Sequence, residues 1–154
     1  MKTEIKKIRM VLVAFIILLA LSGITAFPIR SEIAFLVNHE TAFPPFLQNW
    51  IHQLSSIIQQ TPDVMLYGTD WLAFAHIIIA LFFIPVFIDP VKYKINLHIG
   101  MAACLLIFPL AFICGPIRSI PFFHQLIDCS FGLIGISFLY FIHKRINKLN
   151  TLIS

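Results

Sequence analysis

The polar side chains that could do chemistry in this chain stand between long apolar segments. The stretch from Gly115 to Cys129 holds an arginine, a histidine and an aspartate. Ionisable groups within or beside membrane-spanning segments are costly and are usually paired or functional. Together with polar residues that flank the other apolar segments on the same predicted side, they form a candidate polar cluster of Arg30, Glu32, Asp70, His76, Arg118, His124 and Asp128.

The cluster has two interpretations, and the sequence leaves both open. His124 and Asp128 are four residues apart, so they share one face of a helix. In the structural interpretation, Arg118 forms an ion pair with Asp128 or Asp70 and locks a turn onto the helices. In the functional interpretation, the same side chains bind a ligand or act on it.

Haem and metal sites are the cofactor alternatives. A haem between two helices needs imidazoles at matching depth. His76 and His124 are offset by about a turn and a half of helix, and His98 lies near the opposite end of its segment. A metal site of His76, His124 and Asp128 lacks any known metal-binding motif. We therefore predict no metal and no cofactor.

The three cysteines, Cys104, Cys114 and Cys129, show neither a CxxC motif nor zinc-ligand spacing. Cys114 and Cys129 flank the polar stretch. In an oxidising compartment they could form a disulfide, and otherwise both are free thiols.

Composition identifies the chain as a membrane protein. Of its 154 residues, 59% are hydrophobic and 12% are charged, whereas soluble domains are about 25% charged. Its length allows about four spans of roughly 20 residues each. The pI of about 9.2 does not indicate nucleic-acid binding, because the lysines lie beside apolar segments.

We predict an all-α fold: a four-helix transmembrane bundle with an extracytoplasmic amphipathic helix between spans 1 and 2. The chain 1–154 is expected to be a single membrane domain, with spans near 10–29, 70–88, 95–114 and 122–142. The outer loop, 30–69, should contain the amphipathic helix over 46–60, where apolar residues recur at helical spacing. Small residues along span 4, Ser130, Gly132, Gly135 and Ser137, predict close helix packing.

Two details of the first part of the chain affect this plan. Ser31 is expected to cap a short helix that ends at Asn38, with Glu32 in its first turn. Residues 1–26 are either a cleaved signal or a retained span. Ile24 is unsuitable near a cleavage site, where a small residue is wanted, so we favour a retained span.

Charge predicts the orientation. With the amino terminus inside, the cytoplasmic segments contain nine of the eleven basic residues: Lys2, Lys6, Lys7, Arg9, Lys92, Lys94, Lys144, Arg145 and Lys148. Only Arg30 and Arg118 lie outside. This is the positive-inside pattern, which places both termini in the cytoplasm.

Three runs of sequence carry a resemblance: 23–28 (GITAFP), 67–76 (YGTDWLAFAH) and 115–132, which begins GPIR and includes IDCSFG. In these runs the chain resembles an uncharacterised family of small bacterial multi-span membrane proteins. The resemblance implies a bacterial inner-membrane protein and assigns no catalytic role to any residue.

The expected function is that of a non-enzymatic accessory or binding protein with an outward-facing polar cluster. The alternative is a membrane-embedded enzyme or a redox protein, linked to haem or quinone, that uses the same cluster. The expected partners are the lipid bilayer and other membrane proteins, with no nucleic acid.

Overall fold

The computed structural model describes residues 2–153, with side chains described for 3–149. Contacts group the chain into two compact units, which we describe separately. Unit 1 comprises Met1–Ile17 and Ala80–Ser154, and unit 2 comprises Leu18–Ile79. The prediction of a single membrane domain stays a prediction.

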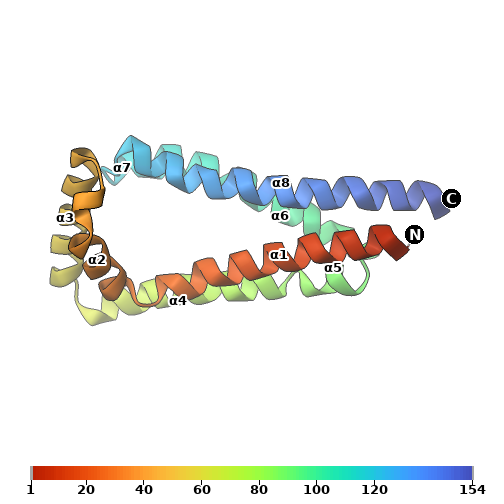
Figure 1. Ribbon diagram of the computed structural model, residues 1–154, viewed down its shortest axis with the longest axis horizontal. Coiled ribbons are helices and arrows are strands. Elements are labelled where there is room, and N and C mark those ends of the chain that lie inside the picture. The colour runs from red at the N-terminus through yellow and green to blue at the C-terminus, as the bar shows by residue number, and fades with distance from the viewer. Residues whose placement is uncertain (1, 154) are drawn as a thin grey trace. The chain divides into compact units, whose positions relative to one another are not determined.

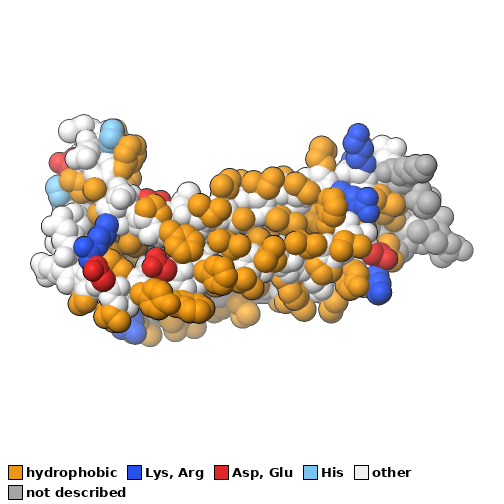
Figure 2. Space-filling model, turned by 90° about the horizontal axis from the view of Figure 1, so that it is seen from below, with side chains coloured by type: hydrophobic (Ala, Val, Ile, Leu, Met, Phe, Trp, Pro, Cys, Tyr) orange, Lys and Arg blue, Asp and Glu red, His pale blue; other side chains and the backbone are white. Residues whose placement is uncertain are grey.

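The predicted all-α, four-span fold class is confirmed. The structure is 88% helical, and its described residues contain no strand. Four helical segments in this part of the chain are long and apolar enough to cross a membrane: Thr3–Ala26, Asp63–Ile88, Lys94–Ile117 and Phe122–Leu149. The protein is therefore a multi-pass membrane protein. Figure 2 shows how hydrophobic side chains cover much of the face that it draws, as lipid contact requires.

The elements follow one another along the chain, and the longest, α1 and α8, lie near its ends. In order they are α1 (Lys2–Ala26), α2 (Ile29–Asn38), η1 (Glu40–Ala42), α3 (Pro45–Gln60), α4 (Asp63–Leu81), α5 (Ile84–Ile88), α6 (Lys94–Pro109), η2 (Leu110–Cys114), α7 (Gly115–Ile117) and α8 (Phe122–Ile153).

Unit 1 is built on α6 and α8, which lie side by side (Figure 1). A Cβ at Gly132 of α8 would lie 2.8 Å from the carbonyl oxygen of Cys104 in α6, and one at Gly135 would lie 2.8 Å from the Cys104 Sγ. The two helices approach this closely because both positions lack a side chain, which confirms the predicted close packing.

The first half of α1 completes this packing in unit 1. Its Ile8 and Leu12 are fully buried. Phe15 packs edge-to-face on Phe83, with ring centroids 5.1 Å apart, a favoured geometry for aromatic pairs. A largely apolar core therefore lies between α1 and the later helices.

A break between α4 and α5 shapes the second span. The helix is interrupted at Phe82 and Phe83, and Pro85 supplies no N–H. The Phe82 carbonyl oxygen accepts a hydrogen bond of 2.8 Å from Nδ2 of Asn96, which is only 7% exposed. A buried side chain of α6 thus replaces a backbone bond that the break removes.

Unit 2 contains α2 and α3, which pack on each other (Figure 1). The amphipathic helix predicted over 46–60 is confirmed as α3, with Ile51 buried on its inner face. The Ser31 cap is wrong. Pro28 occupies the cap position, and its carbonyl accepts the N–H of Glu32 at 2.9 Å. Helix α2 begins before Ser31 because the turn at 27–28 already positions the Pro28 carbonyl to accept its first hydrogen bond.

Several boundaries differ from those predicted. Helix α1 begins at Lys2 rather than at residue 10 and ends at Ala26 rather than at 29, and α8 continues to Ile153 rather than to 142. Helix α4 begins at Asp63, directly after Pro62, rather than at Asp70. Hydropathy marks where the chain leaves hydrocarbon, whereas a helix continues until its hydrogen bonding is interrupted.

Candidate functional site

The predicted cluster is divided between the two units. Unit 2 contains Arg30, Glu32, Asp70 and His76, and unit 1 contains Arg118, His124 and Asp128. We describe each group by itself.

In unit 1, Arg118 follows α7 in an exposed turn, and Asp128 lies on α8. No ion pair joins these two side chains among residues 2–153. Instead, both line a cavity of about 240 Å³ whose other walls are mainly apolar. His124 Nε2 lies 3.9 Å from Asp128 Oδ1, which confirms that the two share a helix face. At this distance the two atoms do not form a hydrogen bond with each other.

The turn between α7 and α8 is fixed by Gln125. This side chain is 4% exposed, and its Nε2 donates to the Ile120 carbonyl at 2.8 Å. A Cβ at Gly115 would lie 2.6 Å from the Gln125 amide carbon, so the glycine leaves room for it. Ser119 in the same turn has φ of 56°, a left-handed conformation that is uncommon for serine. The Gln125 hydrogen bond and the close contact with Gly115 thus define the conformation of this turn.

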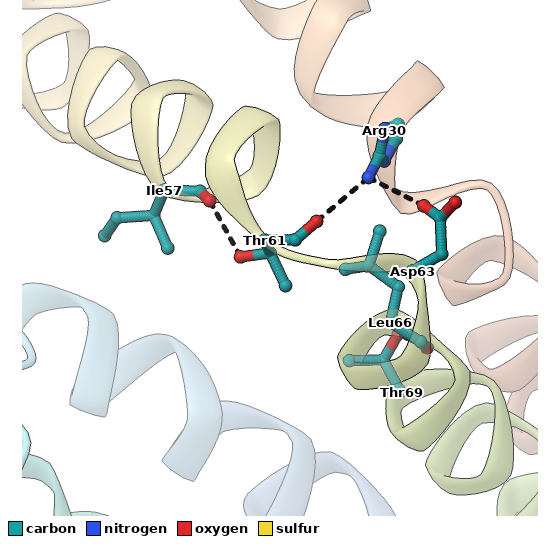
Figure 3. Close-up of polar contacts among 6 residues, drawn as sticks. All are labelled: Arg30, Ile57, Thr61, Asp63, Leu66 and Thr69. Atoms are coloured by element: carbon teal, nitrogen blue, oxygen red, sulfur yellow. Dashed lines mark hydrogen bonds and ion pairs between the residues drawn. The ribbon is translucent and has the colours of Figure 1, made fainter.

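In unit 2, Arg30 connects the start of α2 to the junction of α3 and α4 (Figure 3). Its Nη2 donates to Asp63 Oδ1 at 2.9 Å and to the Thr61 carbonyl at 3.0 Å. The Arg30 side chain is 51% exposed and that of Asp63 is 93% exposed. Such an exposed pair is worth about 0–1 kcal/mol, so it can open at little cost.

Asp70 lies in an aromatic wall formed mainly by α4. Tyr67, Asp70, Trp71 and Phe74 follow the spacing i, i+3, i+4, i+7, so they share one helix face. With Phe27 from the turn after α1, they line a cavity of about 190 Å³, which we call the aromatic cavity. The Asp70 carboxylate is half-buried, and it has no hydrogen-bond or ion-pair partner within the described part of the chain.

A second cavity adjoins the first, and charged side chains form part of its lining. Its volume is about 270 Å³, and its lining shares Phe27, Tyr67 and Asp70 with the aromatic cavity while adding Arg30 and Asp63. One carboxylate without a partner and one exposed arginine–carboxylate pair therefore border the same hollow. Two members of the predicted cluster, Arg30 and Asp70, thus line the same cavity.

Glu32 and His76 do not join this hollow. Glu32 lines a different cavity, with Phe35 and Leu36 of its own helix. His76 Nδ1 lies 2.9 Å from the Leu72 carbonyl oxygen, one turn back in α4. Beside His76, Gly23 of α1 is buried against the carbonyl of Ala73. Gly23 thus allows α1 and α4 to approach closely at this point.

A polar network in unit 1 was not predicted. Lys94 Nζ donates to Asn147 Oδ1 at 2.6 Å, Asn147 Nδ2 lies 3.0 Å from His143 Nε2, and His143 Nδ1 lies 3.1 Å from His98 Nε2. The sequence signal was two pairs at i, i+4 spacing: Lys94 with His98, and His143 with Asn147. The sequence does not show that the two pairs form one network, because that depends on how α6 and α8 align along their lengths.

Cys104, Cys114 and Cys129 are free thiols, with Cys129 buried and Cys114 exposed. Within the described chain, no three histidine, cysteine or acidic side chains gather as metal ligands would. His76 and His124 belong to different units, and the haem alternative stays a prediction.

Comparison of the chain with known proteins finds no matching family, no matching curated protein and no matching solved structure.

Proposed function

We propose that the protein is a non-enzymatic, membrane-embedded binding protein for a small amphiphile. The observation that carries the proposal is the pair of adjoining cavities in unit 2, which share Phe27, Tyr67 and Asp70. One cavity is lined mostly by aromatic rings, and the other adds Arg30 and Asp63.

The chemistry of this pair suits a ligand with a polar head and an apolar tail. Binding sites are typically apolar hollows with a few placed polar groups that fix the ligand's orientation. Here the polar groups are Asp70, without a partner in the described chain, and Arg30, whose exposed pair with Asp63 exchanges readily. The large exposed side chains of α4, among them Leu72 and Ile79, offer apolar surface for a tail.

We place the protein in a bacterial inner membrane with both termini in the cytoplasm. The support is the charge distribution, with nine of eleven basic residues on one side, and the sequence resemblance described above. In this orientation the two cavities open near the extracytoplasmic surface, where an amphiphile's head meets water.

The test of orientation uses two single cysteines, introduced as Gln59→Cys in α3 and Val91→Cys in the turn before α6. A membrane-impermeant maleimide applied to intact spheroplasts should label the first and not the second. The wild-type chain gives the background from its three native thiols. If only Val91→Cys is labelled, the orientation of the protein is the reverse of the one proposed.

The test of binding is recovery of a native ligand. The full chain, extracted from native membrane in a mild maltoside detergent, should carry a bound amphiphile that mass spectrometry detects. The double variant Arg30→Gln/Asp70→Asn should lose it, because both polar contacts with the head are removed. The control is Arg118→Gln/Asp128→Asn, which removes the same charges from the cavity of unit 1. Equal loss in both variants, or loss only in the control, would refute the assignment to unit 2.

A further inference from the structure

We infer that the ligand of unit 2 is a phospholipid or related amphiphile whose zwitterionic head carries an ammonium group and a phosphate. The inference rests on the proposed binding function and specifies its ligand class. The ammonium binds in the aromatic cavity beside Asp70, and the phosphate binds at Arg30.

The aromatic cavity has the features of an ammonium site. Cations bind over the faces of Trp and Tyr rings, and quaternary ammonium groups are held in cages of such rings. The ring of Trp71 stands nearly perpendicular to its neighbours: the interplanar angle is 82° to Tyr67 and 87° to Phe74, with centroids 6.1 and 6.4 Å away. Rings set at right angles form adjacent walls rather than a flat stack.

Asp70 supplies the complementary charge. Its carboxylate stands in the same helical stripe as Tyr67 and Trp71, and no described cation neutralises it. Trp and Tyr at a membrane boundary need no ligand, because their rings suit the headgroup region by themselves. A half-buried carboxylate among them is different, since ionised groups removed from water are usually paired. A bound ammonium group would provide the missing partner.

The adjoining cavity fits the other half of such a head. Arg30 lies within the second cavity, and guanidinium groups bind phosphate oxygens through paired hydrogen bonds. The present partner of Arg30, Asp63, is 93% exposed, so the arginine can release it to water and bind a phosphate instead. The aromatic cavity, at about 190 Å³, exceeds the roughly 150 Å³ that is known to hold a benzene-sized ligand. It is therefore large enough for a substituted ammonium.

Trp71 allows a direct test. In a Trp50→Phe background it is the only tryptophan, because the chain has two. The full-length protein in maltoside detergent is titrated with dihexanoyl phosphatidylcholine and with dihexanoyl phosphatidylglycerol. The two lipids have the same acyl chains and phosphate, and glycerol in the second replaces the choline ammonium of the first. We expect a saturable change in Trp71 emission with the choline lipid and a response at least about tenfold weaker with the glycerol lipid.

Two variants and one control assign the signal to Asp70. Asp70→Asn should weaken binding of the choline lipid about tenfold, whereas Asp70→Glu, which keeps the charge, should retain most of the affinity. Glu32→Gln removes a carboxylate that lines a different cavity and should change nothing. Near-wild-type affinity of Asp70→Asn would overturn the inference.

The remaining outcomes separate this inference from the proposed function. If the glycerol lipid binds as tightly as the choline lipid, the site is an amphiphile site without ammonium selectivity, and only the inference fails. The same holds if neither lipid saturates while a native amphiphile still copurifies. If neither lipid saturates and nothing copurifies, both proposals fail.

Discussion

The polar end of unit 1 and the cavities of unit 2 contain similar side chains used in opposite ways. In unit 1, charged residues from distant parts of the chain bind one another. Arg145 pairs with Glu4 at 2.5 Å and lies over the Phe141 ring, 4.5 Å from its centroid. Arg9 donates to the carbonyls of Phe87 and Ile88 at 3.0 and 3.1 Å. These contacts join α1 to α5 and α8.

The polar groups that line the adjoining cavities of unit 2 stay accessible. Arg30 and Asp63 form an exposed pair, and Asp70 lines two cavities. The comparison shows that charged side chains in a membrane protein should be judged by their partners rather than by their presence. Pairs that join helices of unit 1 hold the fold together, whereas the Asp70 carboxylate, without a described partner beside two cavities, is the basis of the proposed site.

The distribution of buried side chains follows the same division. Among the described residues, the buried hydrophobic side chains belong to unit 1 except for Ile51 and Ala73. The two buried polar residues, Asn96 and Gln125, also belong to unit 1. Unit 1 therefore has the more extensive core, while unit 2 has few side chains to rearrange if a ligand enters.

The largest expected effect is on the packing of α6 against α8. Gly132→Leu forces a side chain toward the Cys104 carbonyl, which should lower the free energy of unfolding by about 1–3 kcal/mol. Gly68→Leu in unit 2 is the matched control, because a Cβ there meets nothing within 4 Å. Thermal unfolding in detergent measures both. A Gly68→Leu effect as large as that of Gly132→Leu would remove the contrast between the units.

A smaller effect is expected for the ion pair between the first and last helices. Arg145→Gln leaves Glu4 without its main partner and should lower the melting temperature by roughly 3–6 °C. Lys144→Gln removes the same charge from an exposed neighbour and should have little effect. In a double-mutant cycle with Glu4→Gln, the loss should not be additive. Additive losses would show that the pair contributes no coupling.

The smallest effect on stability is expected at Arg30. Because its pair with Asp63 is exposed, Arg30→Gln should change the free energy of unfolding by less than about 1 kcal/mol. The same variant should weaken the choline lipid in the Trp71 titration, because the phosphate contact is removed. A large loss of stability with unchanged lipid binding would place Arg30 among the structural residues and reverse its assignment.

The sequence predicted the elements better than their contacts. Apolar periodicity located α3 to within one residue, and hydropathy located the four spans. The extension of α8 to Ile153 was missed, because the polar end of a long helix has the same composition as a loop. A single sequence predicts helices well because the residues that interact within a helix are close together in the chain.

The candidate site was also predicted only in part. Arg30 and Asp70 were selected because charge is rare beside apolar segments. The aromatic stripe of Tyr67, Trp71 and Phe74 was missed, because only ionisable side chains were considered as candidates for the cluster. The contact of Lys94 with Asn147 depends on how two distant helices align, and one sequence carries no direct signal of that register.

The hydrogen bond from Asn96 to the Phe82 carbonyl has a consequence for biogenesis. Helices α4 and α5 leave the ribosome before Asn96 does, so the break at Phe82 initially lacks its donor. An unsatisfied carbonyl in hydrocarbon costs several kcal/mol. We therefore expect this segment to wait at the translocon and to enter the lipid together with α6, as a hairpin. Asn96→Leu should then slow membrane integration, even where the mature protein is stable.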